Sequence, residues 1–105
     1  MIVKTEETIS VAHHLPNYHG KCHNLHGHNL KVEVWCEGEV DKKTGMVVDF
    51  VEIKKIINEL DHKNLNNFIE NPTSENLVKY FMKKIPKCVK VRVWENNKSY
   101  AEASK

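Results

Sequence analysis

The chain has 105 residues, of which 40% are hydrophobic and 29% charged, and its formal net charge is +2. This length supports one globular domain over residues 1–105, while the small charge, carried by scattered lysines, argues against a nucleic-acid partner. No apolar run reaches the ~18 residues of a membrane span, and the start, "MIVKTEETISV", lacks the features of a signal peptide, so we expect a cytoplasmic protein without a membrane partner.

The hydrophobic pattern predicts two strands at the start of the chain. Residues 2–13 end with Ile9, Val11 and His13 on one face. Residues 26–40 alternate more clearly, as expected for a half-buried strand. The buried side of this second strand is predicted to carry His26, His28, Leu30, Val32, Val34 and Cys36.

Two helices are predicted in the middle of the chain. Asp49 and Glu52 resemble a capping box, and Thr73 or Ser74 can cap a second helix that Pro86 ends. Apolar residues recur at helical spacing after both caps. They are Phe50, Ile53, Ile56, Ile57 and Leu60 in the first helix, and Leu77, Val78, Phe81, Met82 and Ile85 in the second.

Two further strands are predicted at the end of the chain. The segment "CVKVRVWE" alternates, and after the turn "ENNKS" a short last strand runs from Tyr100 to Ala103. The order is therefore β-β-α-α-β-β. Short turns between consecutive strands favour an antiparallel four-stranded sheet with both helices on one face, which is an α+β fold.

The other face of the predicted sheet mixes charges with tryptophan. Such a face is consistent with simple exposure to water, and equally with a face that neighbouring subunits cover. The residues assigned to it are Lys31, Glu33 and Trp35 from one strand, and Lys90, Arg92 and Trp94 from another.

Six of the seven histidines lie between residues 13 and 28. His26 and His28 project from the same side of a strand, about 6.6 Å apart along the backbone, and Gly27 leaves room between them. His13 projects from the matching side of the first strand. Two unpaired imidazoles among leucine and valine side chains would incur an uncompensated desolvation cost. We therefore predict a zinc site with three imidazole ligands and one open position, typical of a catalytic metal.

The remaining histidines and the cysteines can be explained without a role in catalysis. His14, His19 and His23 are expected to be solvated loop side chains. Cys22 follows a lysine in a polar loop and precedes His26 by four residues; it can serve as a base, as a fourth zinc ligand or as an inert residue. The other two cysteines, Cys36 and Cys88, are predicted to be structural.

Asp61 and Glu95 can each be interpreted either as a functional carboxylate or as an ordinary surface side chain. Asp61 precedes His62 at the end of the first predicted helix. Near the metal this pair would be a proton-transfer group, although the dipeptide alone means little. Glu95 continues the apolar side of its strand, either as a functional carboxylate or as a strand-end side chain turned to water.

Six motifs occur in order over nearly the whole chain: "AHHLP", "GKCHNLHGHN", "GMVVDF", "LDHKNLN", "NPTSEN" and "VRVWE". Through them the chain resembles the family of 6-pyruvoyltetrahydropterin and 6-carboxytetrahydropterin synthases, which shares the tunnelling fold. The short spacing from Cys22 to "HGH" resembles the carboxy branch, whereas the animal pyruvoyl enzymes usually carry "NGHGHNY" with a longer insertion. A third branch, which makes a folate intermediate, has glutamate in place of the cysteine. The segment "WENNKSYAE" departs from the common "WETP" and leaves the geometry of the last hairpin open.

The resemblance implies a role for each matching position. This chain has counterparts of all the family's functional groups. These groups are the zinc ligands, a general base, a proton-relay pair, a carboxylate that holds the pterin and a segment that lines the pterin pocket. The positions are His13, His26 and His28 for zinc; Cys22 as base; Asp61 and His62 as relay; and Glu95, Thr73, Ser74 and Glu75 for the pterin.

The implied activity converts 7,8-dihydroneopterin triphosphate to 6-carboxytetrahydropterin, acetaldehyde and triphosphate, as in queuosine biosynthesis. The resemblance also implies a homo-oligomer, a trimer or hexamer that closes its sheets into a barrel. Two rivals stay open at this point. The product can instead be 6-pyruvoyltetrahydropterin, by triphosphate elimination alone, or Cys22 can close a purely structural zinc site.

Overall fold

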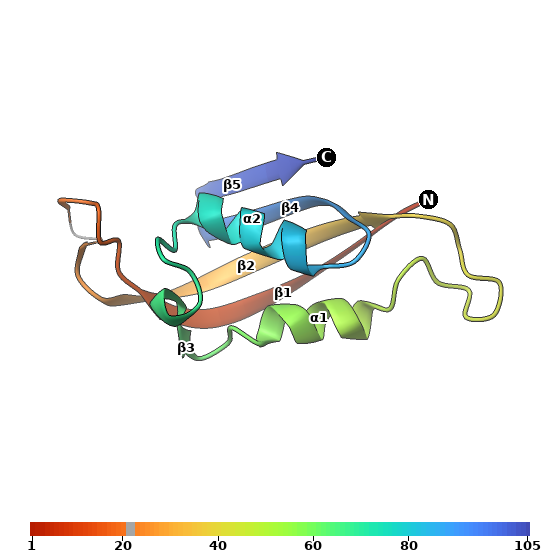
Figure 1. The fold of residues 1–105 in the computed structure, drawn as a ribbon, viewed down its shortest axis with the longest axis horizontal. Helices are drawn as coiled ribbons and strands as arrows, with labels where there is room; N and C mark the ends of the chain where they lie inside the picture. Colours follow the sequence, from red (N-terminus) through yellow and green to blue (C-terminus); the bar gives the residue numbers. More distant parts are fainter. Residues whose placement is uncertain (21–22) are drawn as a thin grey trace.

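The computed structural model describes residues 1–20 and 23–105. Their elements follow in the order β1 (Ile2–His13), β2 (His26–Glu37), α1 (Phe50–Asn58), β3 (Lys63–Asn64), the 3-10 helix η2 (Leu65–Asn67), α2 (Ser74–Lys84), β4 (Cys88–Asn96) and β5 (Ser99–Ser104). Figure 1 shows the two helices lying over a long, twisted sheet. No helix in this described part is long and apolar enough to cross a membrane.

The described residues form a five-stranded sheet in the order β3-β1-β2-β4-β5. The four long strands pair antiparallel, as the sequence predicts, and β1 and β2 are matched along their full lengths from Ile2 with Glu37 to His13 with His26. The two-residue strand β3 adds a short parallel pairing to the end of β1. The predicted α+β architecture is therefore confirmed, with one short strand more than expected.

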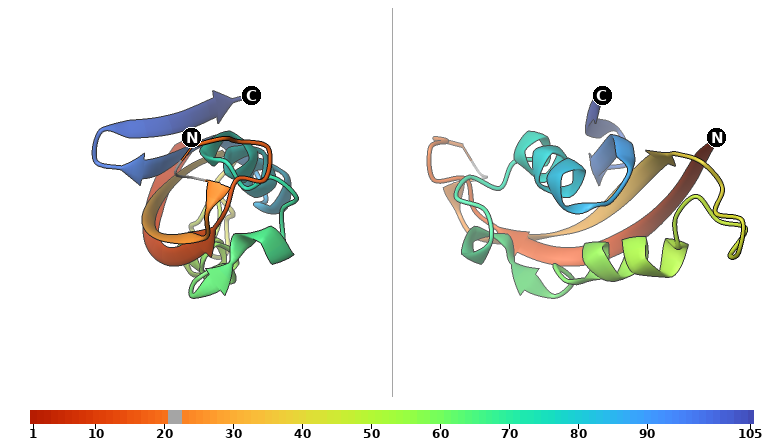
Figure 2. Two further views of the ribbon diagram at one scale, coloured as in Figure 1. Left: turned by 90° about the vertical axis from the view of Figure 1, so that its left-hand side faces the viewer. Right: turned by 45° about the vertical axis from the view of Figure 1, so that its right-hand side comes forward.

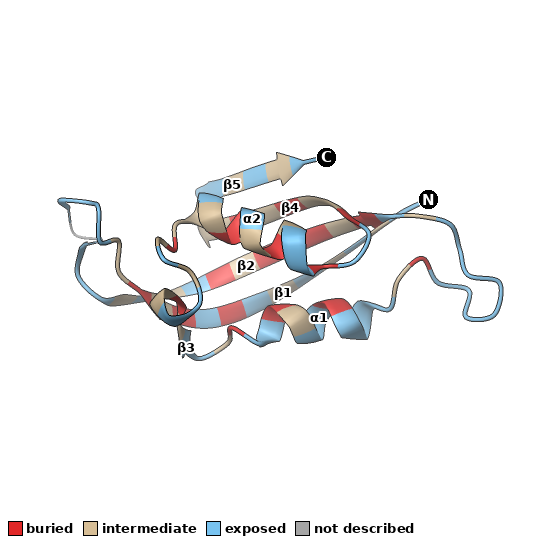
Figure 3. Ribbon diagram, viewed as in Figure 1, coloured by how far each residue is buried: buried red, intermediate tan, exposed pale blue. Residues whose placement is uncertain are grey.

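Both helices pack on the same face of the sheet, α1 along β1 and α2 across β4 (Figures 1 and 2). The bands of buried and exposed residues along β1, β2 and β4 in Figure 3 follow the predicted alternation. One apolar cluster joins the two layers. Its central side chains include Ile9, Leu30, Val32, Ile57, Phe81 and Val91, each no more than 1% exposed.

The predicted cap residues are confirmed, although the hydrogen bonds of the described residues do not include the reciprocal capping-box bond from the Asp49 amide to the Glu52 carboxylate. The Asp49 carboxylate accepts a hydrogen bond of 2.9 Å from the amide of Val51, and the Thr73 hydroxyl accepts one of 3.1 Å from Asn76. Each bond satisfies an amide that the first turn of a helix leaves without a partner. Thr73, rather than Ser74, is the cap of α2.

The segment between the helices is more ordered than its sequence suggests. The pattern-breaking stretch "DHKNLNNFIENP" contains β3 and η2. His62 has a positive φ of 60° there, and its amide donates to the Ser10 carbonyl over 2.6 Å. This contact fixes residues 61–64 against the outer edge of β1.

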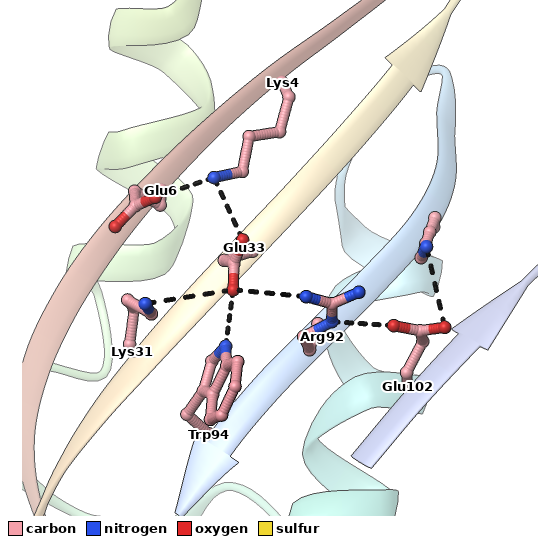
Figure 4. A network of polar contacts seen from close by, with 8 residues as sticks. Lys4, Glu6, Lys31, Glu33, Arg92, Trp94 and Glu102 are labelled. Carbon is pink, nitrogen blue, oxygen red and sulfur yellow. Dashed lines mark hydrogen bonds and ion pairs between the residues drawn. The ribbon is translucent and has the colours of Figure 1, made fainter. Parts of the chain in front are cut away.

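The outward face of the sheet is organised around Glu33, which is only 6% exposed although no helix of residues 1–20 and 23–105 covers that face. Its carboxylate accepts a hydrogen bond from the Trp94 indole and lies 2.9 Å from the Lys4 ammonium, with Lys31 and Arg92 at 4.0 and 3.9 Å (Figure 4). The face that sequence alone leaves as either solvated or covered is therefore an ordered network of charges and aromatic rings.

Candidate metal centre

Three histidines converge where β1 ends and β2 begins. His13 is the direct ladder partner of His26, and His28 is the partner of Val11. Each ring projects from the core-facing side of its strand, because His13 continues the buried series of Ile9 and Val11. The ring centroids lie 4.6 to 5.0 Å apart, and one ligand atom from each ring lies within 4.8 Å of the others. The histidine cluster (His13, His26 and His28) thus has the spacing of a metal site.

Backbone carbonyls orient two of the three rings. Nδ1 of His13 donates to the Pro72 carbonyl over 2.8 Å, and Nδ1 of His26 donates to the Asn24 carbonyl over 2.7 Å. A carbonyl can only accept, so the proton of each neutral ring lies on Nδ1 and the lone pair on Nε2. Such outer hydrogen bonds are typical of histidines that bind metals.

The free nitrogens of the histidine cluster need a cation. The Nε2 atoms of His13 and His26 face each other at 3.1 Å, and two lone pairs at that distance repel. Nε2 of His28 is buried without a hydrogen-bond partner, the one such side-chain atom in residues 1–20 and 23–105. An unsatisfied buried acceptor is costly, and a metal ion would satisfy all three nitrogens together. The residues therefore fit a divalent ion that prefers imidazole.

Burial favours the neutral, metal-binding form of these rings. It lowers the pKa of His13, although the hydrogen bond to Pro72 opposes this effect, and the neighbouring rings of His28 and His26 lower it further. Burial also lowers the pKa of His28, assisted by His26 and opposed by Glu95. A histidine must be deprotonated to bind a metal, so the site is prepared for one near neutral pH.

Glu95 lies beside the histidine cluster at the end of β4. One of its oxygens is 3.9 Å from Nε2 of His28. Glu95 also lines a pocket of about 160 Å³ together with Ser74 and Glu75 from the first turn of α2, and with residues 99–101 of β5. Glu95 thus lies between the histidine cluster and this pocket, with its side chain 35% exposed.

Thr73 contributes to this region through the backbone. It is absent from the residues described as lining the pocket, but its hydroxyl caps α2 and so holds the turn that carries Ser74 and Glu75. Pro72, the residue before it, accepts the hydrogen bond from His13. The start of α2 is thereby tied to the histidine cluster.

Asp61 and His62 form the predicted pair but stand apart from the histidine cluster. Their side chains lie 3.0 Å apart, the His62 ring is 81% exposed, and the Asp61 carboxylate accepts a 2.8 Å bond from the Ser10 amide. That hydrogen bond, with a further contribution from His62, lowers the pKa of Asp61. Among the described residues, no hydrogen bond or ion pair joins His62 to the cluster. The pair lies at the outer edge of β1 within one chain.

Cys22, the predicted base, and Lys21 lie outside the residues that the structure describes. Sequence reasoning also missed several supporting groups. The carbonyls of Pro72 and Asn24 orient the rings, and Asn66 brackets His14 by accepting from its amide at 2.9 Å and donating to its carbonyl at 3.1 Å. Backbone carbonyls have no signature in a sequence, and the Asn66 contact joins segments that lie far apart in it.

Comparison with known proteins yields one consistent family. A family model described as 6-pyruvoyl tetrahydropterin synthase matches residues 2–105. A protein of Archaeoglobus fulgidus with the provisional name 6-carboxy-5,6,7,8-tetrahydropterin synthase is 44% identical over 97% of this chain and 94% of its own length. A Pyrococcus furiosus dihydroneopterin monophosphate aldolase is 42% identical over 70% of this chain and 72% of its own length.

The solved structure of Caenorhabditis elegans 6-pyruvoyl tetrahydropterin synthase superposes on this chain with a TM-score of 0.79. It is 28% identical, and the match covers 100% of this chain and 95% of that one. The fold is thus the tunnelling fold that the sequence motifs imply.

Proposed function

The chain belongs to the 6-pyruvoyl tetrahydropterin synthase family, and from this premise we propose that it is a zinc-dependent 6-carboxy-5,6,7,8-tetrahydropterin synthase. Its substrate is 7,8-dihydroneopterin triphosphate, which with one water yields 6-carboxytetrahydropterin, acetaldehyde and triphosphate, a step of queuosine biosynthesis. The observation that carries the proposal is the convergence of one ring nitrogen from each of the three histidines in the histidine cluster.

The donor set of this cluster suits zinc. Three neutral imidazoles bind zinc well and leave a coordination position for substrate. When bound, the ion would act as a Lewis acid that lowers the pKa of the substrate's side-chain hydroxyls. His13, His26 and His28 are the residues that would hold it.

Glu95 is the proposed anchor of the pterin ring. A carboxylate can accept two parallel hydrogen bonds from the amino and ring N–H groups of a pterin, which fixes its orientation. Two observations support this role: Glu95 lies 3.9 Å from His28, one of the proposed metal ligands, and the pocket that it shares with Ser74 and Glu75 offers space for a ring. The side chain of a pterin held there would point toward the histidine cluster.

Cys22 is the proposed base that removes a proton from the substrate side chain, and His62, oriented by Asp61, is the proposed second proton carrier. Because His62 lies apart from the histidine cluster within one chain, the relay pair of one subunit would act on a site that is completed by another. This argument supports a homo-oligomer with sites between subunits.

Two free strand edges support the same assembly. Within the described residues, β3 pairs only with Val11 and Ala12, so residues 2–10 of β1 lack a partner strand on their outer side, and β5 ends the other side of the sheet. Pairing of β5 with β1 of the next copy would close a ring and remove both edges. We expect a trimer or a hexamer, which light scattering would distinguish from a monomer.

The identity of the product separates this proposal from two enzymatic alternatives. A 6-pyruvoyltetrahydropterin synthase would eliminate triphosphate without releasing acetaldehyde. The likeness to the Pyrococcus furiosus protein favours, as a second candidate, an aldolase that acts on dihydroneopterin monophosphate. Cys22 argues only against a third possibility, the folate branch, which carries glutamate at that position.

The deciding experiment incubates the zinc-loaded protein separately with 7,8-dihydroneopterin triphosphate and with the monophosphate. Mass analysis of the pterin product and an acetaldehyde assay are the readouts. We expect 6-carboxytetrahydropterin and acetaldehyde from the triphosphate only. A pyruvoyl product, or turnover of the monophosphate alone, would replace the proposal by the corresponding alternative.

A structural zinc site is the remaining rival, and the Cys22→Ala variant tests it. The enzyme proposal predicts that this variant retains zinc and loses turnover. Loss of zinc together with loss of the fold would instead identify Cys22 as a structural ligand.

A further inference from the structure

The two buried cysteines are direct neighbours across the sheet. Cys36 of β2 pairs with Cys88 of β4 just beyond a register shift between Trp35 and Cys36, at the opposite end of β2 from the histidine cluster. The Glu37 amide donates a hydrogen bond of 3.0 Å to the Lys87 carbonyl. This bond joins the residues next to the two cysteines rather than the cysteines themselves. In a regular antiparallel ladder a non-hydrogen-bonded pair has Cα atoms ~4.5 Å apart, and a neighbouring β-bulge changes this spacing locally. A disulfide can form at Cα separations of about 4.4–6.8 Å, a range that includes the regular spacing and a moderately widened one.

Both side chains are buried in the same part of the core. Cys36 is 0% exposed and Cys88 is 3% exposed, and both belong to the apolar cluster beneath the helices. Both are free thiols: the Cys36 thiol points to the Pro86 carbonyl at 3.5 Å and the Cys88 thiol to the Lys90 carbonyl at 3.6 Å. These weak hydrogen bonds hold the two sulfur atoms toward different residues of the same segment. Rotation about the Cα–Cβ bonds would turn them toward each other.

We propose that Cys36 and Cys88 are a modification site that closes to a cross-strand disulfide in the folded protein when it meets a small-molecule disulfide such as oxidised glutathione. One thiolate attacks the oxidant, releases one glutathione and forms a mixed disulfide. The second cysteine then attacks the protein sulfur and releases the other glutathione. The two cysteines lose two protons and two electrons, and the electrons reduce the S–S bond of the oxidant. This inference is independent of the proposed enzyme activity.

Burial makes the reaction slow rather than forbidden. It raises the pKa of the Cys36 thiol to about 11, with a further increase from Cys88, and it raises the pKa of Cys88 as well. Few thiolates are therefore present at neutral pH. Cys88 is the first residue of β4, however, and the end of a strand opens more readily than its centre. Such opening would admit the oxidant.

The disulfide would stabilise the fold, because the loop that it closes contains both helices. Closing so long a loop restricts the unfolded chain and costs the native state little where the geometry fits. For a domain of this size we expect the midpoint of thermal unfolding to rise by roughly 10 °C or more.

The test treats the folded protein and its Cys22→Ala variant with oxidised glutathione and digests both without reduction. We expect a linked peptide that contains Cys36 and Cys88, a higher unfolding midpoint, and return to the original midpoint with dithiothreitol. Cys88→Ala serves as the control that cannot form the link. The linked peptide is detected in the wild-type protein itself, so the test does not depend on whether the Cys88→Ala control is stable. Two outcomes would overturn the proposal. In the first, glutathione is found on Cys22 while Cys36 and Cys88 can still be alkylated after denaturation. In the second, the linked form melts no higher than the reduced form.

Discussion

His13 and His26 are direct partners in the β1–β2 ladder, and their Nε2 atoms lie 3.1 Å apart. The carbonyls of Pro72 and Asn24 hold the opposite nitrogens of the two rings. The register of two strands and two short loops therefore sets this spacing. Two acceptor nitrogens so close to each other suit a shared cation.

Replacement of His26 by alanine should remove the metal. One of three ligands is lost, so zinc content should fall from about one ion per chain to nearly none after dialysis. His14→Ala is the matched control, because its main chain, not its ring, makes the contacts with Asn66, and it should retain zinc. Elemental analysis of both variants checks the prediction, and equal zinc contents would refute it.

The metal-free protein should lose stability as the pH falls below about 6.5, the ordinary pKa of histidine. Burial lowers the pKa of both His13 and His28, so over this range the unfolded chain binds protons that the folded chain does not. Stability must then decrease as pH decreases. Urea unfolding between about pH 7.5 and 5.5 measures the slope. The His28→Gln variant should show a shallower slope, and identical slopes would contradict the assignment.

Loss of the Glu33 carboxylate should destabilise the sheet. Glu33→Ala leaves the Trp94 N–H and the surrounding cations without their buried acceptor, which should lower the free energy of unfolding by about 1–3 kcal/mol. Glu6→Ala removes the more exposed partner of Lys4 and should cost less than about 1 kcal/mol. Chemical denaturation of both variants compares them. Equal losses would mean that Glu33 is an ordinary surface charge.

The stability that the Glu33 carboxylate contributes should depend on pH in acid. Burial alone would raise the pKa of Glu33, but the hydrogen bonds from Trp94 and Lys4 and the nearby positive charges outweigh it, so the pKa is lowered. The stability that Glu33 contributes is therefore complete above the unfolded pKa of about 4.3 and is lost as the pH falls through the folded value. The difference in unfolding free energy between wild type and Glu33→Gln should shrink below about pH 4. A difference that stays constant in acid would contradict the lowered pKa.

Replacement of Glu95 by glutamine should weaken pterin binding without removing zinc. An amide can accept only part of the bonding pattern that a carboxylate accepts, and the loss of a charge-assisted hydrogen bond of about 1.5–3 kcal/mol corresponds to roughly 10- to 100-fold weaker binding. Glu39→Gln, in the exposed loop beyond the other end of β2, is the control and should bind normally. Titration with a non-reacting pterin, together with zinc analysis, measures both effects. Unchanged pterin affinity would exclude Glu95 as the anchor.

The alternation of apolar residues was sufficient to predict the long strands and the side from which the histidines project. His13, His26 and His28 continue the buried series of their strands, so their convergence needed only the correct pairing of β1 with β2. The caps at Asp49 and Thr73 were also readable, because capping is local chemistry.

Features that depend on distant contacts could not be predicted. Strand β3 exists because residues 63 and 64 meet the end of β1, and the pattern of "DHKNLNN" contains no sign of that pairing. The separation of His62 from the histidine cluster likewise follows from the path of the chain at a positive φ. The burial of Glu33 on an uncovered face depends on cations from three strands, which no single segment reveals.

X-ray absorption at the zinc edge of the purified protein tests the central proposal most directly. We expect three nitrogen neighbours at about 2.0–2.1 Å and one oxygen that a bound pterin replaces, because three imidazoles should leave one position open. A sulfur neighbour at about 2.3 Å that persists in the presence of the pterin would show that Cys22 closes the site, and a closed site could not bind the substrate side chain.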